Sequence, residues 1–379
     1  MNVEERFLKY ITFDTQSDEN STTFPSTMKQ KELGKYLADE LKAIGAQDVE
    51  LDPYGYVYAT IPASKGVNAP HLAYIAHMDT SPAASGKNVK AVIDHEPGRD
   101  VIHTDGTTLL GADDKAGVAE IVTACEQFLQ NPALPHPEIR VLFTPDEEVG
   151  TGVDHASLER LNAKYGFTVD GGEVGELSYE CFNAASARVI INGRSFHPGD
   201  SFGKMKNACL MAAEFIAMLP EKETPATTQG REGFYHLDNM SGSVEKMQLD
   251  YILRDFDALK LEQKKKNMQK IVSEFNRRYG YAAAEITITD SYRNMIEALL
   301  PDYEFLLNAV RNTYEDLGIP VNEDPVRGGT DGARLSFEGL PCPNLGTGGH
   351  DFHGPHEWIT IQSMRKVVDV LIKLAEKLS

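Results

Sequence analysis

Short apolar runs alternate along the first half of the chain with longer segments in which apolar residues recur at three-and-four spacing. The runs, such as 141–144, predict buried strands, and the spaced segments, such as 28–44, predict helices. The same alternation returns after residue 296 and closes in a helix at the C-terminal end. Strands that alternate with helices predict an α/β domain, in which a mixed sheet is covered by helices on both faces.

The pattern changes between residues 185 and 295. An alternating strand, ARVIINGRSF, is followed by a helical segment, two further strands, a charged helix and the strand AAAEITITD. This β-α-β-β-α-β order is typical of the split βαβ, ferredoxin-like arrangement. Because 379 residues exceed the usual size of one domain, we predict a discontinuous first domain at 1–184 and 296–379, with a second domain inserted at 185–295.

Composition narrows the classes of function. The net charge of −20 argues against a protein that binds nucleic acid or anionic membranes. The start, MNVEERFLKYI, predicts an amphipathic helix rather than a signal peptide, and no apolar run is long enough to span a bilayer. The four cysteines are scattered without CxxC spacing. We therefore expect a cytoplasmic protein of a reducing compartment.

Histidine and carboxylate side chains gather where four predicted strands or strand-loop segments end. The stretches HLAYIAHMD, LLGADDKAG, VLFTPDEEVG and FTVDGG supply His77 and Asp79, Asp113 and Asp114, Glu147 and Glu148, and Asp170. Any one of them is also typical of a solvated acidic loop. Because sites in open α/β sheets form at the carboxyl ends of strands, their repetition favours a shared site. Imidazole and carboxylate without cysteine suit zinc, manganese or cobalt.

Taken together, the motifs resemble those of the peptidase T family of tripeptide aminopeptidases, within the superfamily of two-zinc aminopeptidases, carboxypeptidases and aminoacylases. The motifs run nearly end to end: DTQSDE, AHMDTSP, LLGADDKAG, TPDEEVG, VDGGEVGELSYECFNAA, HPG, GGTDGARLSFEGLPCPNLGTGG and FHGPHE. The resemblance implies two zinc ions per subunit, for which Mn²⁺ or Co²⁺ can substitute. It also implies a short peptide as substrate and a homodimer formed through the inserted domain, which would act as lid and dimerisation domain.

The resemblance also assigns the metal ligands. The expected set is His77 and Asp170 for the first ion, Glu148 and His353 for the second, and Asp113 as the bridge between them, with a cis peptide after it. His353 is chosen because it stands four residues before Glu357, as the family's ligand stands before its glutamate. His350 is the alternative in the wrong register.

Two further carboxylates have implied roles that do not include metal binding. Asp79 would hold the His77 imidazole in one tautomer. Glu147 would be the general base toward a hydroxide held between the two metals, and would return the proton to the leaving amine.

The inserted domain and the glycine-rich segment supply candidates for substrate contacts. By resemblance, His197 would reach the active site of the partner subunit and stabilise the oxyanion, whereas without the resemblance a surface histidine is the simpler interpretation. Arg254 and Arg327 could each bind the C-terminal carboxylate of the substrate through two N–H groups, and we favour Arg327. Asn294 and Thr330 are candidate polar contacts.

We therefore expect metal-dependent hydrolysis of the N-terminal peptide bond of tripeptides or similar short peptides. The alternatives are a dipeptidase or an N-acyl-amino-acid deacylase on the same scaffold, a non-catalytic peptide-binding protein, and a magnesium-dependent phosphoryl transferase. The last lacks a phosphate loop, because GGTDG is not followed by GKS or GKT. A short segment between His77 and Asp113, and HPGDSFGKMKNA in place of HPGTAKGKMVNA, depart from the family pattern and leave the substrate length open.

Overall fold

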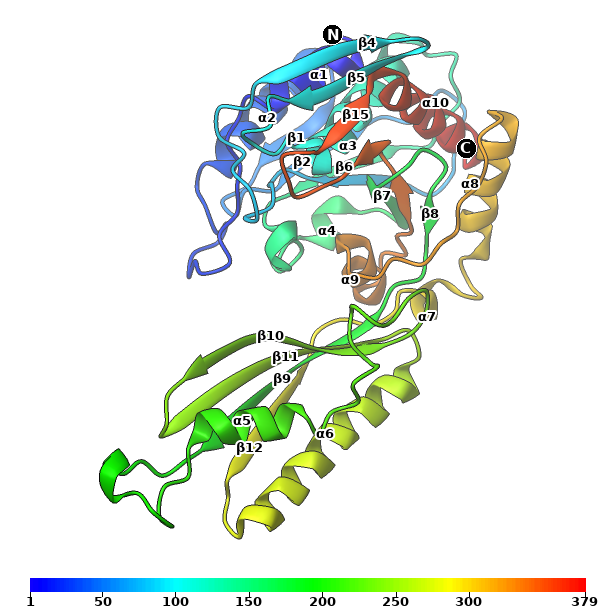
Figure 1. The fold of residues 1–379 in the computed structure, drawn as a ribbon. Helices are drawn as coiled ribbons and strands as arrows, with labels where there is room; N and C mark the ends of the chain where they lie inside the picture. The colour runs from blue at the N-terminus through cyan, green and yellow to red at the C-terminus, as the bar shows by residue number, and fades with distance from the viewer. The chain divides into compact units, whose positions relative to one another are not determined.

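The computed structural model describes residues Met1–Ser379 and divides into two compact units. Unit 1 comprises Met1–Tyr179, Met295–Asp324 and Thr330–Ser379, and unit 2 comprises Glu180–Asn294 and Pro325–Gly329. Figure 1 follows the chain through both units. The segment Pro325–Gly329, which we had assigned to the first domain, belongs to unit 2.

A seven-stranded sheet forms the centre of unit 1. Its strands lie in the order β1 (Gln47–Leu51), β2 (Val57–Ile61), β6 (Ile139–Thr144), β3 (Leu72–His77), β7 (Tyr165–Gly171), β13 (Asn344–Gly346) and β8 (Leu177–Ser178). The strands β6, β3, β7 and β13 pair in parallel, whereas the other pairs are antiparallel. The predicted mixed sheet is thus confirmed.

Both faces of this sheet are covered. One face shares a core with helices α1 (Val3–Tyr10), α2 (Gln30–Ile44), α3 (Ala112–Gln130), α8 (Glu304–Asp316) and α10 (Ile361–Lys377). The other face packs on a smaller core that includes residues of α4 (Leu158–Leu161) and α9 (Asp331–Glu338). Successive side chains of β3 point to opposite faces of the sheet. Leu72 and Tyr74 therefore pack in the first core, and Ala73 and Ile75 pack in the second. All six residues of β3 are buried as a result.

A small antiparallel sheet of unit 1 was not predicted. It contains β14 (Gly349–His350), β15 (Trp358–Thr360), β5 (Arg99–Thr104) and β4 (Ala91–Glu96) in that order. The residues of β4 are largely exposed, so the strand has little apolar alternation for a sequence pattern to detect. The pairing of β14 with β15 fixes the segment between these two strands, which carries the predicted metal ligand His353.

Unit 2 has the element order β9 (Asn183–Asn192), α5 (Ala208–Ile216), β10 (Phe234–Gly242), β11 (Lys246–Asp255), α6 (Ala258–Tyr279) and β12 (Ala284–Asp290). Its four strands pair antiparallel in the order β10, β11, β9, β12. Along β11 buried and partly exposed residues alternate, and the buried ones share a core with α5 and α6. The sheet thus has one face packed on two helices.

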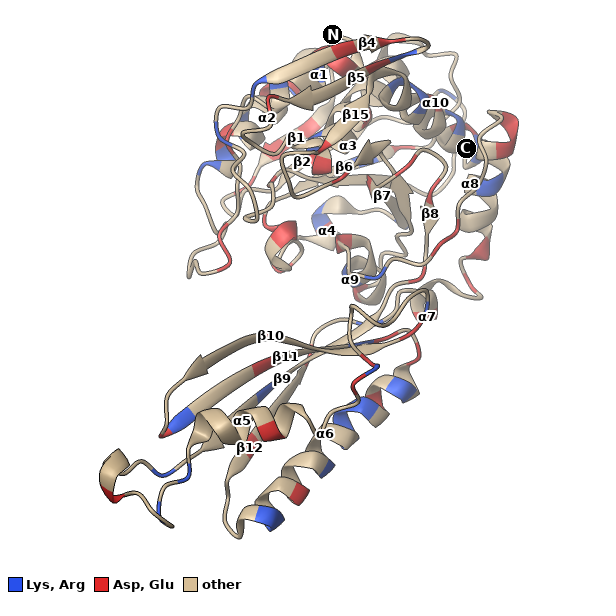
Figure 2. Ribbon diagram, viewed as in Figure 1, with Lys and Arg blue, Asp and Glu red and all other residues tan.

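Charged residues are interspersed over both units, and lysines and arginines recur along α6 (Figure 2). One of them, Lys264, is buried and lies 3.8 Å from a carboxylate oxygen of Asp255. None of the helices combines the length and the apolar character that crossing a membrane would require.

Candidate metal centre

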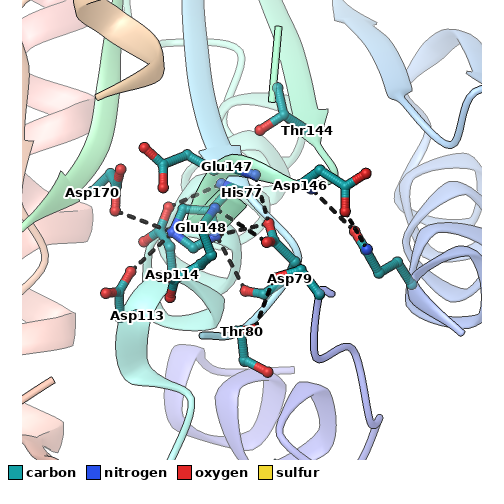
Figure 3. A network of polar contacts seen from close by, with 12 residues as sticks. His77, Asp79, Thr80, Asp113, Asp114, Thr144, Asp146, Glu147, Glu148 and Asp170 are labelled. Carbon is teal, nitrogen blue, oxygen red and sulfur yellow. Dashed lines mark hydrogen bonds and ion pairs between the residues drawn. The ribbon is translucent and has the colours of Figure 1, made fainter. Parts of the chain in front are cut away.

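The candidate ligands lie where strands of the unit 1 sheet end. His77 is the last residue of β3, Asp170 lies near the end of β7, and Glu148 lies in the short 3₁₀ helix Glu147–Val149 that follows β6. Because β6, β3 and β7 are parallel neighbours, these ends meet at one edge of the sheet. Asp113 joins them from the start of α3, and Figure 3 shows carboxylates gathered around the His77 ring.

The two carboxylate oxygens of Asp113 face two different histidines. Its Oδ1 lies 2.9 Å from His77 Nε2, and its Oδ2 lies 3.0 Å from His353 Nε2. Asp170 Oδ1 approaches the same nitrogen of His77 at 3.4 Å. Glu148 Oε2 approaches the His353 nitrogen at 3.1 Å. All five residues expected to bind metal are therefore brought together, with Asp113 between the two pairs.

Two sets of donor atoms are close enough to hold an ion. The atoms within each set lie within 4.8 Å of one another, and the sets are His77, Asp113 and Glu148, and His77, Asp114 and Asp170. Asp114 was not expected as a ligand. Its carboxylate accepts hydrogen bonds from the backbone N–H groups of His77 and Gly117, at 3.1 and 3.2 Å. The peptide bond between Asp113 and Asp114 is cis.

The buried carboxylates of the cluster would be stabilised by a bound cation. Burial raises the pKa of Glu148, and it raises the pKa of Asp170 to about 7. Glu148 Oε1 is buried and has no hydrogen-bond partner. Buried carboxylates that crowd together are destabilised unless a positive charge compensates them. With imidazole and carboxylate donors and no cysteine, the set has the chemistry of a zinc, manganese or cobalt site.

The two imidazoles already concentrate positive charge. Burial opposes protonation of His77, but the carboxylates of Asp170 and Asp113 outweigh it and hold the pKa of His77 well above its usual value. Hydrogen bonds with Asp113 and Glu148 raise the pKa of His353 to about 10. A metal ion binds the neutral imidazole, so binding at this cluster would displace those protons.

Asp79 has a wider structural role than the one expected. The His77 Nδ1 atom lies 3.1 Å from the Asp79 backbone carbonyl and 3.3 Å from its Oδ1, which fits the predicted orientation of the ring. The same carboxylate accepts hydrogen bonds from the backbone N–H groups of Glu147 and Glu148, at 3.0 and 3.2 Å. Asp79 therefore also fixes the turn that carries both glutamates.

A second anchor of this turn was missed in the sequence. Asp146 has a φ of 58°, in the left-handed region, and immediately precedes Glu147. Its carboxylate accepts hydrogen bonds from the backbone and hydroxyl groups of Ser26 and from Gln30 Nε2, while its N–H donates to Gln30 Oε1. These bonds hold a backbone conformation that most residues avoid.

A further carboxylate, that of Asp331, is buried close enough to His77 and Asp79 to interact with them electrostatically. It accepts a hydrogen bond from the Thr144 hydroxyl at 2.8 Å, and burial raises its pKa to about 6. Its oxygens would collide with a Cβ atom placed on Gly152. The motif GGTDG had pointed to this segment without assigning Asp331 a role.

The histidine expected to act from the inserted domain lies on an exposed turn of unit 2. The His197 side chain is 80% exposed, and its Nδ1 accepts a hydrogen bond from the Gly199 N–H at 3.2 Å. Within its own unit, the imidazole is therefore open to solvent.

The two candidate arginines are held by backbone carbonyl groups of unit 2. Arg327 donates to the carbonyls of Gly230 and Glu232, at 2.6 and 3.1 Å, and Arg254 donates to that of Ala185 at 3.3 Å. A guanidinium carries five N–H donors, so each keeps donors for a further partner.

The other two candidates have side chains with structural partners. Asn294 is 2% exposed, and its amide bonds to the backbone of Cys181 and Phe256. The Thr330 hydroxyl accepts from the Ala333 N–H and caps α9.

Known proteins are similar to this chain in sequence and in fold. The model of peptidase family M20/M25/M40 matches residues 73–377. Peptidase T of Halothermothrix orenii is 46% identical over 401 aligned positions, which cover 99% of this chain and 98% of the relative. The aligned region is longer than the chain, so that relative contains residues that this chain lacks.

Among solved structures, aminopeptidase PepT from Bacillus cereus superposes with a TM-score of 0.82 at 24% identity. A tripeptidase from Staphylococcus aureus superposes with a TM-score of 0.84 at 23% identity. Each match covers 100% of this chain and 98% of the other. At these identities the superpositions establish the fold.

Proposed function

The chain belongs to peptidase family M20/M25/M40, as a peptidase T-type metallo-aminopeptidase, and from this premise we propose that it removes the N-terminal residue of tripeptides or similar short peptides with two metal ions. The observation that carries the proposal is the division of the Asp113 carboxylate between His77 and His353. A carboxylate in that position can bind two ions at once. The names of the Bacillus and Staphylococcus proteins support the choice of an aminopeptidase acting on tripeptides.

His77 and Asp170 would hold one ion, Glu148 and His353 the other, and Asp113 both. We propose zinc in the cell, with Mn²⁺ or Co²⁺ able to replace it. Asp114 is not assigned as a ligand, because its oxygens already accept backbone hydrogen bonds. When bound, a pair of such ions polarises the carbonyl group of the substrate and lowers the pKa of water.

Glu147 is the proposed general base. Its backbone N–H is held by Asp79, which aims the residue toward the cluster, and its carboxylate belongs to neither set of donor atoms. A carboxylate that is close to the reacting water but free of metal can accept the water's proton. The same group then returns that proton to the nitrogen of the leaving amine.

Unit 2 is the proposed ferredoxin-like lid and dimerisation domain, and His197 its contribution to catalysis in the partner subunit of a homodimer. The exposure of the His197 side chain fits a role toward a group outside its own unit. Arg327, or otherwise Arg254, would bind the C-terminal carboxylate of the peptide. Asn294 and Thr330 remain candidate polar contacts with the substrate, and both side chains also have partners within the chain. We also propose a cytoplasmic location.

A substrate panel tests this function. Zinc-loaded protein is given Met-Gly-Gly, Met-Gly and N-acetyl-Met-Gly-Gly, and the release of free methionine and of acetate is measured. Release from Met-Gly-Gly alone is the expected result. Preferential cleavage of Met-Gly would instead identify a dipeptidase, and release of acetate from the acylated peptide would identify a deacylase.

A further inference from the structure

Glu357 is a buried carboxylate that binds only backbone groups of a distant loop. It is 1% exposed. Its Oε2 accepts hydrogen bonds from the N–H groups of Leu110 and Gly111, at 2.7 and 2.8 Å. Its Oε1 accepts one from the N–H of Asp113, at 3.0 Å. In the sequence, Glu357 had served only to choose between neighbouring histidines.

The loop that Glu357 binds reaches α3 at a residue that has no side chain to cap the helix. This residue, Gly111, precedes the helix with a φ of 86°, and within the helix the Asp114 carboxylate accepts only from Gly117, further along. Asp113 has non-helical backbone angles, with φ −86° and ψ 103°. Because the first N–H groups of a helix lack partners within the helix, a carboxylate placed there is stabilising. Glu357 therefore fixes backbone that the helix alone would leave free.

Glu357 also links two parts of the candidate site. His353 lies four residues before it and faces one oxygen of Asp113, while Glu357 holds the backbone N–H of that same aspartate. The strand β15 begins at the next residue and pairs with β5, which fixes this segment from its other side. One short segment thus positions both His353 and the loop that carries Asp113.

We propose that Glu357 is a positioning residue that fixes Asp113 so that its two oxygens serve two metal ions. The inference rests on the proposed function in one respect, the bridging role of Asp113. A purely structural alternative is that Glu357 only stabilises the start of α3. The two roles differ in whether the geometry of bound metal changes when the protein remains folded.

The substitution Glu357→Gln separates these roles. Glutamine has the same shape, but its NH₂ group must face either the Asp113 N–H or the N–H pair of Leu110 and Gly111. A donor would then oppose a donor, and the loop would shift. The matched control is Asp52→Asn. Asp52 is also buried, but it lies in the turn between β1 and β2 and accepts from the N–H groups of Tyr54 and Tyr56 through Oδ1 alone. Asparagine can keep that oxygen in place, so D52N removes a buried charge without opposing two donors.

Three measurements decide the question: amide hydrogen exchange in the metal-free protein, Co²⁺ bound per chain with its absorption spectrum, and kcat and KM for Met-Gly-Gly. In E357Q we expect faster exchange at Leu110, Gly111 and Asp113, an altered Co²⁺ spectrum, and metal affinity or kcat lowered by about 10- to 100-fold, as for other groups that orient a metal ligand. KM should change less than kcat. D52N should keep the wild-type values.

Wild-type Co²⁺ stoichiometry, spectrum and kcat in folded E357Q would overturn the inference. If E357Q does not fold, Glu357→Asp keeps the charge but withdraws it by one methylene, and an unchanged spectrum in that variant would be equally contradictory. Hydrogen exchange and Co²⁺ binding need no substrate. If wild-type protein fails to cleave peptides, the proposed function fails while the role of Glu357 is still decided.

Discussion

The residues expected to carry chemistry are held very differently in the two units. At the sheet edge of unit 1, His77 is 2% exposed, and its ring contacts three carboxylates. In unit 2 the His197 side chain is 80% exposed and hydrogen-bonds only to the turn that carries it. The candidate metal ligands are therefore gathered within one chain, whereas the proposed catalytic role of His197 would require a group outside its own turn.

The largest effect is expected from Glu147→Gln. Removing the proton acceptor should lower kcat by about 10²- to 10⁴-fold, while the fold and metal content stay unchanged, because Glu147 is in neither donor set. Steady-state kinetics and metal analysis provide the test. Glu159→Gln, on the exposed side of α4, is the control and should be neutral. Substantial turnover in E147Q would remove Glu147 from its role.

Asp113→Asn tests the bridge. The amide presents only one oxygen and no charge, so both ions should bind more weakly, by about 10-fold or more, whereas Asp170→Asn should weaken mainly one. Isothermal titration of metal into chelator-stripped protein gives the two affinities. Two tightly held ions in D113N would show that Asp113 does not span them.

His197→Ala should leave metal binding intact and lower kcat by about 10²- to 10³-fold, if the imidazole stabilises the oxyanion. Mixing H197A with D170N subunits should restore part of the activity, because a mixed dimer then contains one complete site. Absence of recovery, once exchange of subunits is demonstrated, would place His197 in its own subunit or outside catalysis.

The smallest effect concerns the anchored turn. Gln30→Ala removes a donor to the buried carboxylate of Asp146, so the free energy of unfolding should fall by about 1–3 kcal/mol, and kcat should also fall. The control in unit 2 is Asn276→Ala, because the Asn276 amide also makes two hydrogen bonds to one residue, in its case to the backbone carbonyl and N–H of Ala284. Denaturation and kinetics of both variants are compared. Equal kcat values would mean that the turn needs no anchor.

The sequence predicted what depends on local patterns. Apolar runs predicted the parallel strands β3, β6 and β7 of unit 1. The residues at their ends, together with the family resemblance, identified the side chains that the structure gathers around His77. The roles of Asp146, Gln30 and Glu357 were not predicted, because their partners are backbone groups or side chains 116 to 247 residues away. Hydrogen bonds between residues so far apart produce no periodic pattern in the sequence. The strand β4 escaped because its residues are mostly exposed.

The boundary at Pro325–Gly329 illustrates the same limit. The segment lies between stretches of unit 1 in sequence, but its Val326 N–H donates to the carbonyl of Glu180, and it is counted with unit 2. This pairing depends on the three-dimensional path of the chain, and the composition of the segment does not indicate that path.

The central claim is that one edge of the unit 1 sheet holds two ions and uses them to hydrolyse peptides. Zinc is added stepwise to chelator-stripped protein, and the release of methionine from Met-Gly-Gly is measured at each ratio. We expect no turnover without metal and full activity only at two ions per chain. Turnover by metal-free protein, or failure to bind any ion, would contradict it.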